Sequence, residues 1–294
     1  MEEKIKSMIN PYKKEIGKFI EGVPDNLEIV NLGSTFSKFG FDYKWFNKKG
    51  FNFAVQPQPL AYDSIILNKY AKNIKKGAVV VVVVCPFGFT VDYYPNDDAN
   101  YKYYFFLDKK EILGYSRTKE FFVKRLPFLT RFATSGLLGR VIRKLGKITG
   151  WQSAEEVRHK DHRINGWMCE FDLSNMVDGS QKEKFEPVFQ YTIGSLRKIL
   201  ETCKKHEFKP VIINMPAVKA QSSEFSDEFI DSFYSANVSS ANFCGAPVID
   251  YFRDVRFDDS TLYENGADCL NDKGREYFAK IFIDDLKKLG LWEE

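Results

Sequence analysis

The sequence predicts an α/β fold in which helices cover both faces of a parallel five-stranded sheet, giving three layers. Apolar, β-branched runs bounded by turn residues recur along the chain, and segments with helical periodicity lie between them. The chain has 294 residues, 44% of them hydrophobic and 28% charged. This size and composition allow a sizeable core and exclude disordered, collagen-like and mini-protein classes.

Five runs are expected to form the strands. They are Leu27–Leu32, Phe51–Val55, Ala78–Cys85, Pro210–Met215 and Pro247–Tyr251. The third run contains six consecutive valines at positions 79–84 and has no polar alternation. Such a run is typical of a strand buried on both faces, so we expect it at the centre of the sheet.

Three segments have the periodicity of helices that pack on a sheet. Tyr62–Lys75 and Val188–His206 place apolar residues three and four positions apart and are expected to be crossover helices. Asp272–Leu289 is expected to be the last helix, with Asn271 as its N-cap. We therefore predict one domain over residues 1–294, with an inserted helical cap at 90–187, because that stretch is too long for a single crossover.

The predicted cap carries most of the positive charge. Arg117–Lys147 contains nine Lys or Arg residues and one Glu, whereas the whole chain has a net charge of only +3. Apolar residues alternate with the basic ones, a pattern typical of amphipathic helices on an anionic membrane surface. The alternative is a cap whose apolar face packs inward while its cations are solvated. The near-neutral total and the absence of an RNA-binding motif predict no nucleic-acid partner.

Cysteine content and hydropathy predict a location in the cytoplasm, with at most peripheral contact at the inner membrane face. The five cysteines are an odd number without metal-ligand spacing, which favours reduced thiols and no metal site. The first twenty residues lack the apolar run of a signal peptide. The longest apolar run, Ala78–Phe87, is about half the length of a membrane-spanning helix.

The tripeptide Gly33-Ser34-Thr35 follows the first predicted strand and is the first candidate site. Ligands of parallel sheets bind at the carboxyl ends of the strands. A hydroxyl at a strand-to-helix turn, with backbone N–H groups beside it, is a candidate nucleophile with part of an oxyanion hole. The alternative is an ordinary turn and helix cap. Gln58, Tyr62, Asp63 and Met215 follow other strands and suit a carbohydrate ligand, as do the cap tyrosines 101, 103 and 104 unless these belong to the core.

Several blocks carry a resemblance to a known family. They include NLGSTFSKFGFDY, FNFAVQPQPLAYDSIIL, KPVIINMPAVK, APVIDYFRDVRF and GADCLNDKGREYF. In sequence and order these blocks resemble the SGNH/GDSL hydrolase-like proteins found with bacterial capsule and surface-polysaccharide genes, over most of the chain except the cap. The resemblance implies a flavodoxin-like sheet. It also implies an esterase or acyltransferase that removes or adds acetyl groups on sugars.

The resemblance also implies site residues, and these depart from the family pattern. The first block of the family usually reads Gly-Asn-Ser or Gly-Asp-Ser with a serine nucleophile, but here Thr35 takes that place and Ser34 precedes it. The last block usually reads Asp-x-x-His-Leu-Asn, but Cys269 stands for the histidine and Gly266 for the aspartate, with Asp268 adjacent. The expected ligand-contacting positions are Gly33, Gln56, Gln58, Gly88, Met215 and Asn271.

A Ser or Thr hydroxyl needs an adjacent base, which contributes typically 10²–10⁴-fold to the rate. A Cys269 thiolate takes this role if its pKa is lowered; the alternative is that Cys269 is a structural residue. His159 or His162 of the cap is a second source of a base, unless these imidazoles belong to a surface cluster or a metal site. His206 lies at the C-terminal end of a predicted helix, where a positively charged imidazole interacts favourably with the helix dipole.

Two main functions remain open from the sequence, beside a peripheral membrane adaptor in which only the cap acts. The first is an SGNH-type carboxylester hydrolase or O-acetyltransferase acting on cell-surface polysaccharide or its precursor. It would need no cofactor, apart from acetyl-CoA as acyl donor in the transferase case. The second is a catalytically inactive protein of polysaccharide assembly that binds a sugar or serves as a scaffold. The expected partner in both cases is a carbohydrate or acylated sugar.

Overall fold

The computed structural model describes residues 12–92, 98–125, 160–264 and 269–293. The chain divides into two compact units. The smaller unit comprises Met1–Val23 and Tyr93–Arg158, and the larger, called the sheet unit below, comprises Pro24–Asp92 and His159–Glu294. The predicted cap range 90–187 is therefore shared between the two units.

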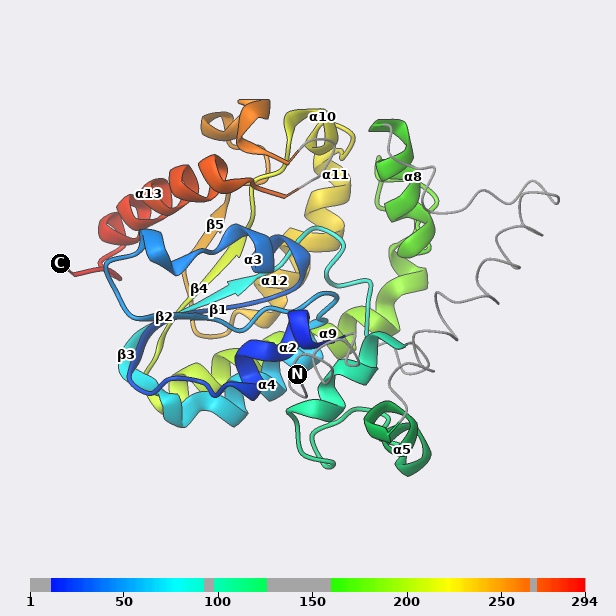
Figure 1. Ribbon diagram of the computed structural model, residues 1–294. Coiled ribbons are helices and arrows are strands. Elements are labelled where there is room, and N and C mark those ends of the chain that lie inside the picture. Colours follow the sequence, from blue (N-terminus) through cyan, green and yellow to red (C-terminus); the bar gives the residue numbers. More distant parts are fainter. Residues whose placement is uncertain (1–11, 93–97, 126–159, 265–268, 294) are drawn as a thin grey trace. The chain divides into compact units, whose positions relative to one another are not determined.

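The sheet unit contains one open sheet of five parallel strands in the order β2-β1-β3-β4-β5 (Figure 1). The strands are β1 (Leu27–Leu32), β2 (Gly50–Asn52), β3 (Ile74–Val83), β4 (Lys209–Asn214) and β5 (Val248–Asp250). Val80 at the centre of β3 pairs with Val30 of β1 and Pro210 of β4. The order 2-1-3-4-5 is that of flavodoxin-like sheets, so the predicted fold class is confirmed.

The strand boundaries show where the sequence pattern was less informative. β1 has its predicted bounds, but β2 ends at Asn52 although the apolar run continues to Val55. The side chain of Asn52 accepts the N–H of Ala54 at 3.0 Å, so the backbone leaves the strand ladder there. β3 begins four residues before Ala78 and ends two residues before Cys85.

Helices cover both faces of the sheet (Figure 1). One face carries α3 (Thr35–Gly40) and α13 (Asp272–Lys288), and the other carries α4 (Leu60–Tyr70) and α9 (Lys182–His206). α13 begins as predicted, with the Asn271 side chain accepting the N–H of Gly274 at 2.9 Å. α9 begins six residues earlier than predicted, because Pro187 lies inside its first turns instead of marking its start.

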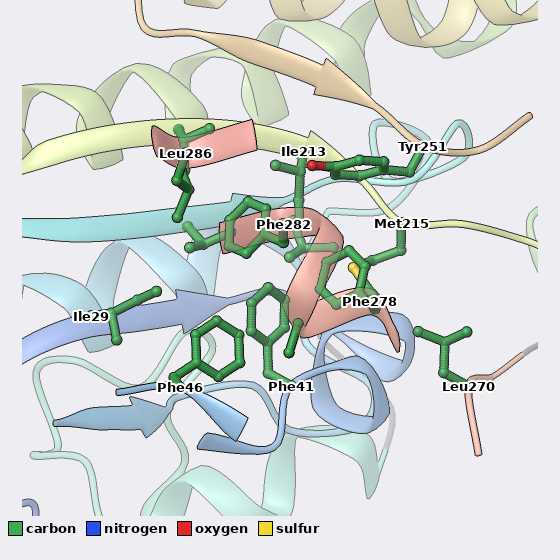
Figure 2. Packing of buried hydrophobic residues seen from close by; sticks show 14 of the residues in the cluster. Ile29, Phe41, Phe46, Ile213, Met215, Tyr251, Leu270, Phe278, Phe282 and Leu286 are labelled. Atoms are coloured by element: carbon green, nitrogen blue, oxygen red, sulfur yellow. The ribbon is translucent and has the colours of Figure 1, made fainter. Parts of the chain in front are cut away.

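The core between the sheet and α13 is aromatic (Figure 2). Phe278 and Phe282 lie one turn apart on α13 with ring centroids 5.4 Å apart, and Phe41 contacts both rings edge-on. Alternation along β3 directs Val79, Val81 and Val83 to this face and Val80 and Val82 to the other. The valine run is thus buried on both faces and central, as predicted.

The remaining elements of the sheet unit follow β4 or precede α9. They are α8 (Lys160–Glu170), α10 (Lys219–Ser222), α11 (Asp227–Ile230), a π-helical segment (Asp231–Ser235) and α12 (Ala236–Ala241), with short 3-10 turns between other elements. The smaller unit contains α2 (Lys13–Ile20), a 3-10 helix (Asp98–Phe105) and α5 (Arg117–Arg125). All five cysteines are free. Across the described ranges, no helix has both the length and the apolar content needed to cross a bilayer.

Candidate functional site

The candidate site lies at the carboxyl ends of β1 and β3, the neighbouring strands at which the strand order reverses. Ligands of open α/β sheets bind at such a switch point. β1 leads into Gly33 and Ser34, and β3 leads into the turn Cys85–Gly88. Gly33 has φ +121°, and a Cβ built there would lie 2.9 Å from the backbone oxygen of Val83. The two strand ends therefore touch, and only glycine fits between them.

Buried side chains from the segment after β2 fix the Gly33–Ser34 turn. The N–H of Gly33 donates to Oδ1 of Asp63 at 2.8 Å, and Nε2 of Gln58 donates to the same oxygen at 2.5 Å. The backbone N–H of Gln58 donates to Oγ of Ser34 at 3.0 Å. The hydroxyl of Ser34 and the N–H of Gly33 thus hold two loops together.

Asp63 is a buried acid without a cationic partner in its hydrogen bonds. Its side chain is 1% exposed, and burial raises its pKa from 3.8 to about 7 against the opposing hydrogen bonds from Gln58 and Gly33. Its second oxygen, Oδ2, has no hydrogen-bond partner among the residues that the structure describes. A buried carboxyl of this kind exists in both protonation states near neutral pH. The sequence showed Asp63 only as a polar residue after a strand, and its apolar neighbours were the signal of its burial.

A second buried polar network holds α3 against β1 and β2. Nδ2 of Asn31 donates to Oγ of Ser37 at 2.8 Å and to Oδ1 of Asn52 at 2.9 Å, while the Tyr43 hydroxyl donates to Oδ1 of Asn31 at 2.8 Å. The hydroxyl of Ser37 donates to the backbone oxygen of Leu32. The sequence analysis missed this network, whose signal was one asparagine inside an apolar strand. It gives the start of α3 a fixed position.

Thr35 differs from Ser34 although the two hydroxyls are adjacent. Thr35 is the first residue of α3 and is partly exposed, and its hydroxyl has no hydrogen bond in the described part of the chain. Ser34 is the residue before the helix, and its oxygen is already an acceptor for Gln58. Of the two predicted nucleophiles, Thr35 is therefore the one whose hydroxyl is available to a ligand.

Aromatic rings surround Phe36, the residue that follows Thr35 in α3. Phe36, next to Thr35, contacts Phe87 with ring centroids 6.5 Å apart and Trp167 of α8 at 6.4 Å. Phe87 also stacks on Phe171 at 4.4 Å, and Phe225 lies 6.0 Å from Trp167. Phe87, Trp167 and Phe225 are buried, whereas Phe36 and Phe171 are partly exposed. The carboxyl end of β3 is thus lined by rings, which the sequence analysis did not connect to the site.

Cys85 directly follows the end of β3 and is not poised as a nucleophile. Burial raises the pKa of its thiol from 9.0 to about 12, although the N–H groups of Phe87 and Gly88 act in the opposite direction. The nearby carboxylate of Glu170 raises the pKa further. The thiol therefore stays protonated near neutral pH and behaves as a small apolar group.

The predicted residues of the final block have mostly structural contacts where they are described. The backbone oxygen of Cys269, a half-buried residue, accepts the N–H of Glu264 at 3.0 Å. Asn271 caps α13 and donates Nδ2 to the backbone oxygens of Thr261 and Tyr263 at 2.8 and 2.9 Å. Gly266 and Asp268 lie outside the described residues. These contacts favour a structural role for Asn271 over a ligand contact.

The start of α13 lies beside the end of α3. Nη1 of Arg275 lies 3.4 Å from the backbone oxygen of Phe39, and Nζ of Lys44 lies 4.0 Å from Oδ1 of Asp272. The first turn of α13 therefore lies beside the Phe39 end of α3, whereas Thr35 occupies the other end of the same helix.

The other predicted ligand contacts are divided between core and surface. Met215 is 3% exposed and packs so closely on Gly40 that a Cβ there would lie 2.2 Å from the methionine Cε. Gln58 is 4% exposed and bonded to Asp63, so its contacts favour a positioning role. Gln56 is exposed, and Gly88 is partly buried with its N–H bonded to the oxygen of Cys85.

Of the three histidines that could supply a general base, the structure describes the side chain of one, His206. His206 ends α9, and its ring stacks on Phe208 at 5.5 Å, just before β4 begins at Lys209. This is the amino edge of the sheet, opposite to the candidate site. His159 and the side chain of His162 lie outside the described residues. Among the described side chains, no imidazole lies at the carboxyl edge.

No family model matches this chain, and no curated protein matches it. The likeness to the SGNH/GDSL hydrolases consequently depends on the sequence blocks, and the flavodoxin-like strand order is consistent with it.

Proposed function

We propose that the protein is a ligand-binding relative of the SGNH/GDSL hydrolases that holds an acylated sugar at the carboxyl ends of β1 and β3 without turning it over. One observation carries the proposal: the N–H of Gly33 donates to the buried Asp63, and the hydroxyl oxygen of Ser34 accepts the N–H of Gln58. The Gly33 N–H is therefore not available to a developing oxyanion, and the Ser34 hydroxyl is held in a positioning contact.

The surroundings of Thr35 support binding. Sites for small ligands combine apolar and aromatic walls with a few polar groups that fix orientation. Here Phe36 and Phe171 offer partly exposed rings, and the Thr35 hydroxyl, on the residue before Phe36, offers one donor and an acceptor. An acetylated sugar has an apolar acyl group and ring faces for the aromatic side chains, together with oxygens for the hydroxyl.

The second candidate function is acyl transfer or ester hydrolysis with Thr35 as the acyl acceptor. The observation that favours it is the partly exposed Thr35 hydroxyl, which has no hydrogen bond within the described residues. This function requires a base from outside the described side chains, such as His159 or His162. In hydrolysis, Thr35 would take the acetyl group from a cell-surface polysaccharide or its precursor, and water would release it as acetate. In transfer, acetyl-CoA would acetylate Thr35 with CoA leaving as the thiol, and the polysaccharide would then accept the acetyl group.

Titration calorimetry with a panel of O-acetylated oligosaccharides and their deacetylated counterparts tests the binding function. We expect at least one acetylated member to bind, and Phe36→Ala to weaken it by about tenfold through the loss of buried apolar area. Thr35→Ala should weaken it less, by the value of one hydrogen bond. Phe243→Ala is the matched control, because Phe243 is 49% exposed and lies between α12 and β5, near the amino edge of the sheet.

Two results would contradict the binding function. The first is the absence of binding by every oligosaccharide up to millimolar concentration. The second is binding that Phe36→Ala and Phe243→Ala affect equally, since the ligand would then lie elsewhere. Chemical cleavage of the acetyl group during the titration, lost in Thr35→Ala, would favour the second candidate function instead.

A further inference from the structure

The helix α5 of the smaller unit presents aromatic and basic side chains to solvent. Phe121 is 57% exposed and Phe122 is 44% exposed, with their rings edge-on at 5.7 Å. Val123, the next residue, is fully buried. Val123 is therefore the apolar side chain that packs α5 onto its unit, and the two phenylalanines remain exposed to solvent.

Charge on this helix is asymmetric. α5 contains Arg117, Lys119, Lys124 and Arg125 against one acid, Glu120. That acid is already neutralised within the unit, because Nζ of Lys124 lies 2.8 Å and Nζ of Lys109 lies 3.2 Å from its carboxylate. Arg117 and Arg125 are exposed and form no ion pair with any described residue.

The exposed residues share one face. Arg117, Phe121 and Arg125 lie four residues apart, which places them in a row along the helix. Phe122 flanks this row, and Val123 lies on the opposite side. Rings flanked by arginines on one face suit a membrane interface, because the long arginine side chains can reach the lipid phosphates while the rings enter the headgroup boundary. Single-stranded RNA also uses rings and arginines, but it stacks bases between flat platforms, whereas these two rings meet edge-on.

We propose that the face of α5 formed by Arg117, Phe121, Phe122 and Arg125 docks on the surface of an anionic lipid bilayer. The phenyl rings enter the boundary between headgroups and acyl chains, where they lose contact with water. The two guanidinium groups, which form no ion pair with a described residue, pair with lipid phosphates. This proposal is independent of the ligand at the sheet and does not need it to bind.

Cosedimentation of the full chain with vesicles tests the proposal. We expect binding to vesicles of phosphatidylcholine that contain about 30% phosphatidylglycerol, weak binding to pure phosphatidylcholine, and release as salt rises. Phe121→Ser with Phe122→Ser should lower the partition coefficient by about tenfold. Arg117→Gln with Arg125→Gln should lower it by about fivefold for each charge removed.

Matched controls distinguish the contribution of this face from the effect of any other exposed ring or cation on vesicle binding. Phe243→Ser removes an exposed ring from the sheet unit, and Lys198→Gln with Lys204→Gln removes two exposed cations from α9. Both controls should bind vesicles as the parent does. Circular dichroism should show the same helix content in every variant, because all the changed side chains are exposed.

A spectroscopic variant retains the apolar character of the face. Phe121→Trp should be quenched by brominated lipids, and Phe243→Trp should not be, relative to the four native tryptophans. The proposal is overturned if the chain does not bind anionic vesicles, or if the α5 variants bind as tightly as the controls. It is also overturned if the chain binds single-stranded RNA more tightly than vesicles and the α5 substitutions abolish that binding.

Discussion

The ends of β1 and β3 lie side by side, yet their chemistry is opposite. The β1 end is polar, with Gly33 and Ser34 bonded to Asp63 and Gln58. The β3 end is apolar, with Cys85 kept protonated by burial and Phe87 surrounded by other rings. Polar groups at a strand end are thus not necessarily available to react with a ligand. Here they position the loop, while the neighbouring strand end supplies the surface that a ligand meets.

The largest expected effect comes from closing the space between the two strand ends. Gly33→Ala places a Cβ 2.9 Å from the Val83 oxygen at φ +121°, and we expect a loss of roughly 4 kcal/mol or more in unfolding free energy. Gly77→Ala is the control, since Gly77 also has a positive φ of 77° but has nothing within 4 Å of the new Cβ. It should cost about 1 kcal/mol. Equal losses in urea denaturation would mean that the strand ends do not touch.

The β3 end should resist alkylation. Burial raises the pKa of the Cys85 thiol to about 12, so almost none of it is thiolate at pH 8, and Cys85 should react with iodoacetamide much more slowly than the exposed Cys169 and Cys244. Peptide mass spectrometry of the native protein over a time course measures each rate. Labelling of Cys85 at the rate of the two exposed thiols would show that the β3 end is open and polar.

The β1 end should make stability depend on pH through Asp63. Because its pKa is raised from 3.8 in the unfolded chain to about 7 in the fold, the folded protein binds this proton more tightly, and stability falls as pH rises through that window. Between pH 5 and pH 8 the loss should be about 3 kcal/mol. Asp63→Asn keeps an acceptor for Gly33 and Gln58 and removes the titration.

Urea denaturation of the parent and of Asp63→Asn at both pH values isolates this contribution, because all other groups cancel in the difference. The variant should gain stability relative to the parent at pH 8 compared with pH 5. If the difference in unfolding free energy between parent and variant does not change with pH, Asp63 is ionised at both pH values. The β1 end would then be more solvated than the structure shows.

The smallest expected effect separates the two adjacent hydroxyls. Ser34→Ala removes the acceptor of the Gln58 N–H and should cost about 1 kcal/mol. Thr35→Ala removes a hydroxyl without a described partner and should change stability by less than about 0.5 kcal/mol. Thermal unfolding of both variants gives the comparison. The reverse order would assign the structural role to Thr35 and leave Ser34 as the available hydroxyl.

The sequence was sufficient for the sheet but not for the site. The valine run and the turn residues around each apolar run predicted five parallel strands, because burial on both faces leaves a pattern in a single stretch of chain. The capping role of Asn271 was local too, and it was found. The hydrogen bonds of Asp63 join residues 30 positions apart, and the rings of Phe87 and Trp167 come from different elements. Contacts between residues so far apart in the sequence cannot be predicted from the hydropathy pattern of a single segment.

Hydrolysis of p-nitrophenyl acetate by the full chain tests the central claim, that the site at the ends of β1 and β3 binds a ligand and does not react with it. The account predicts a rate equal to that of Thr35→Ala. Thr35→Ser combined with Cys269→His and Gly266→Asp, which restores the family residues, should gain activity if the fold retains the site. Turnover by the parent chain that Thr35→Ala abolishes would contradict the account and make Thr35 a nucleophile.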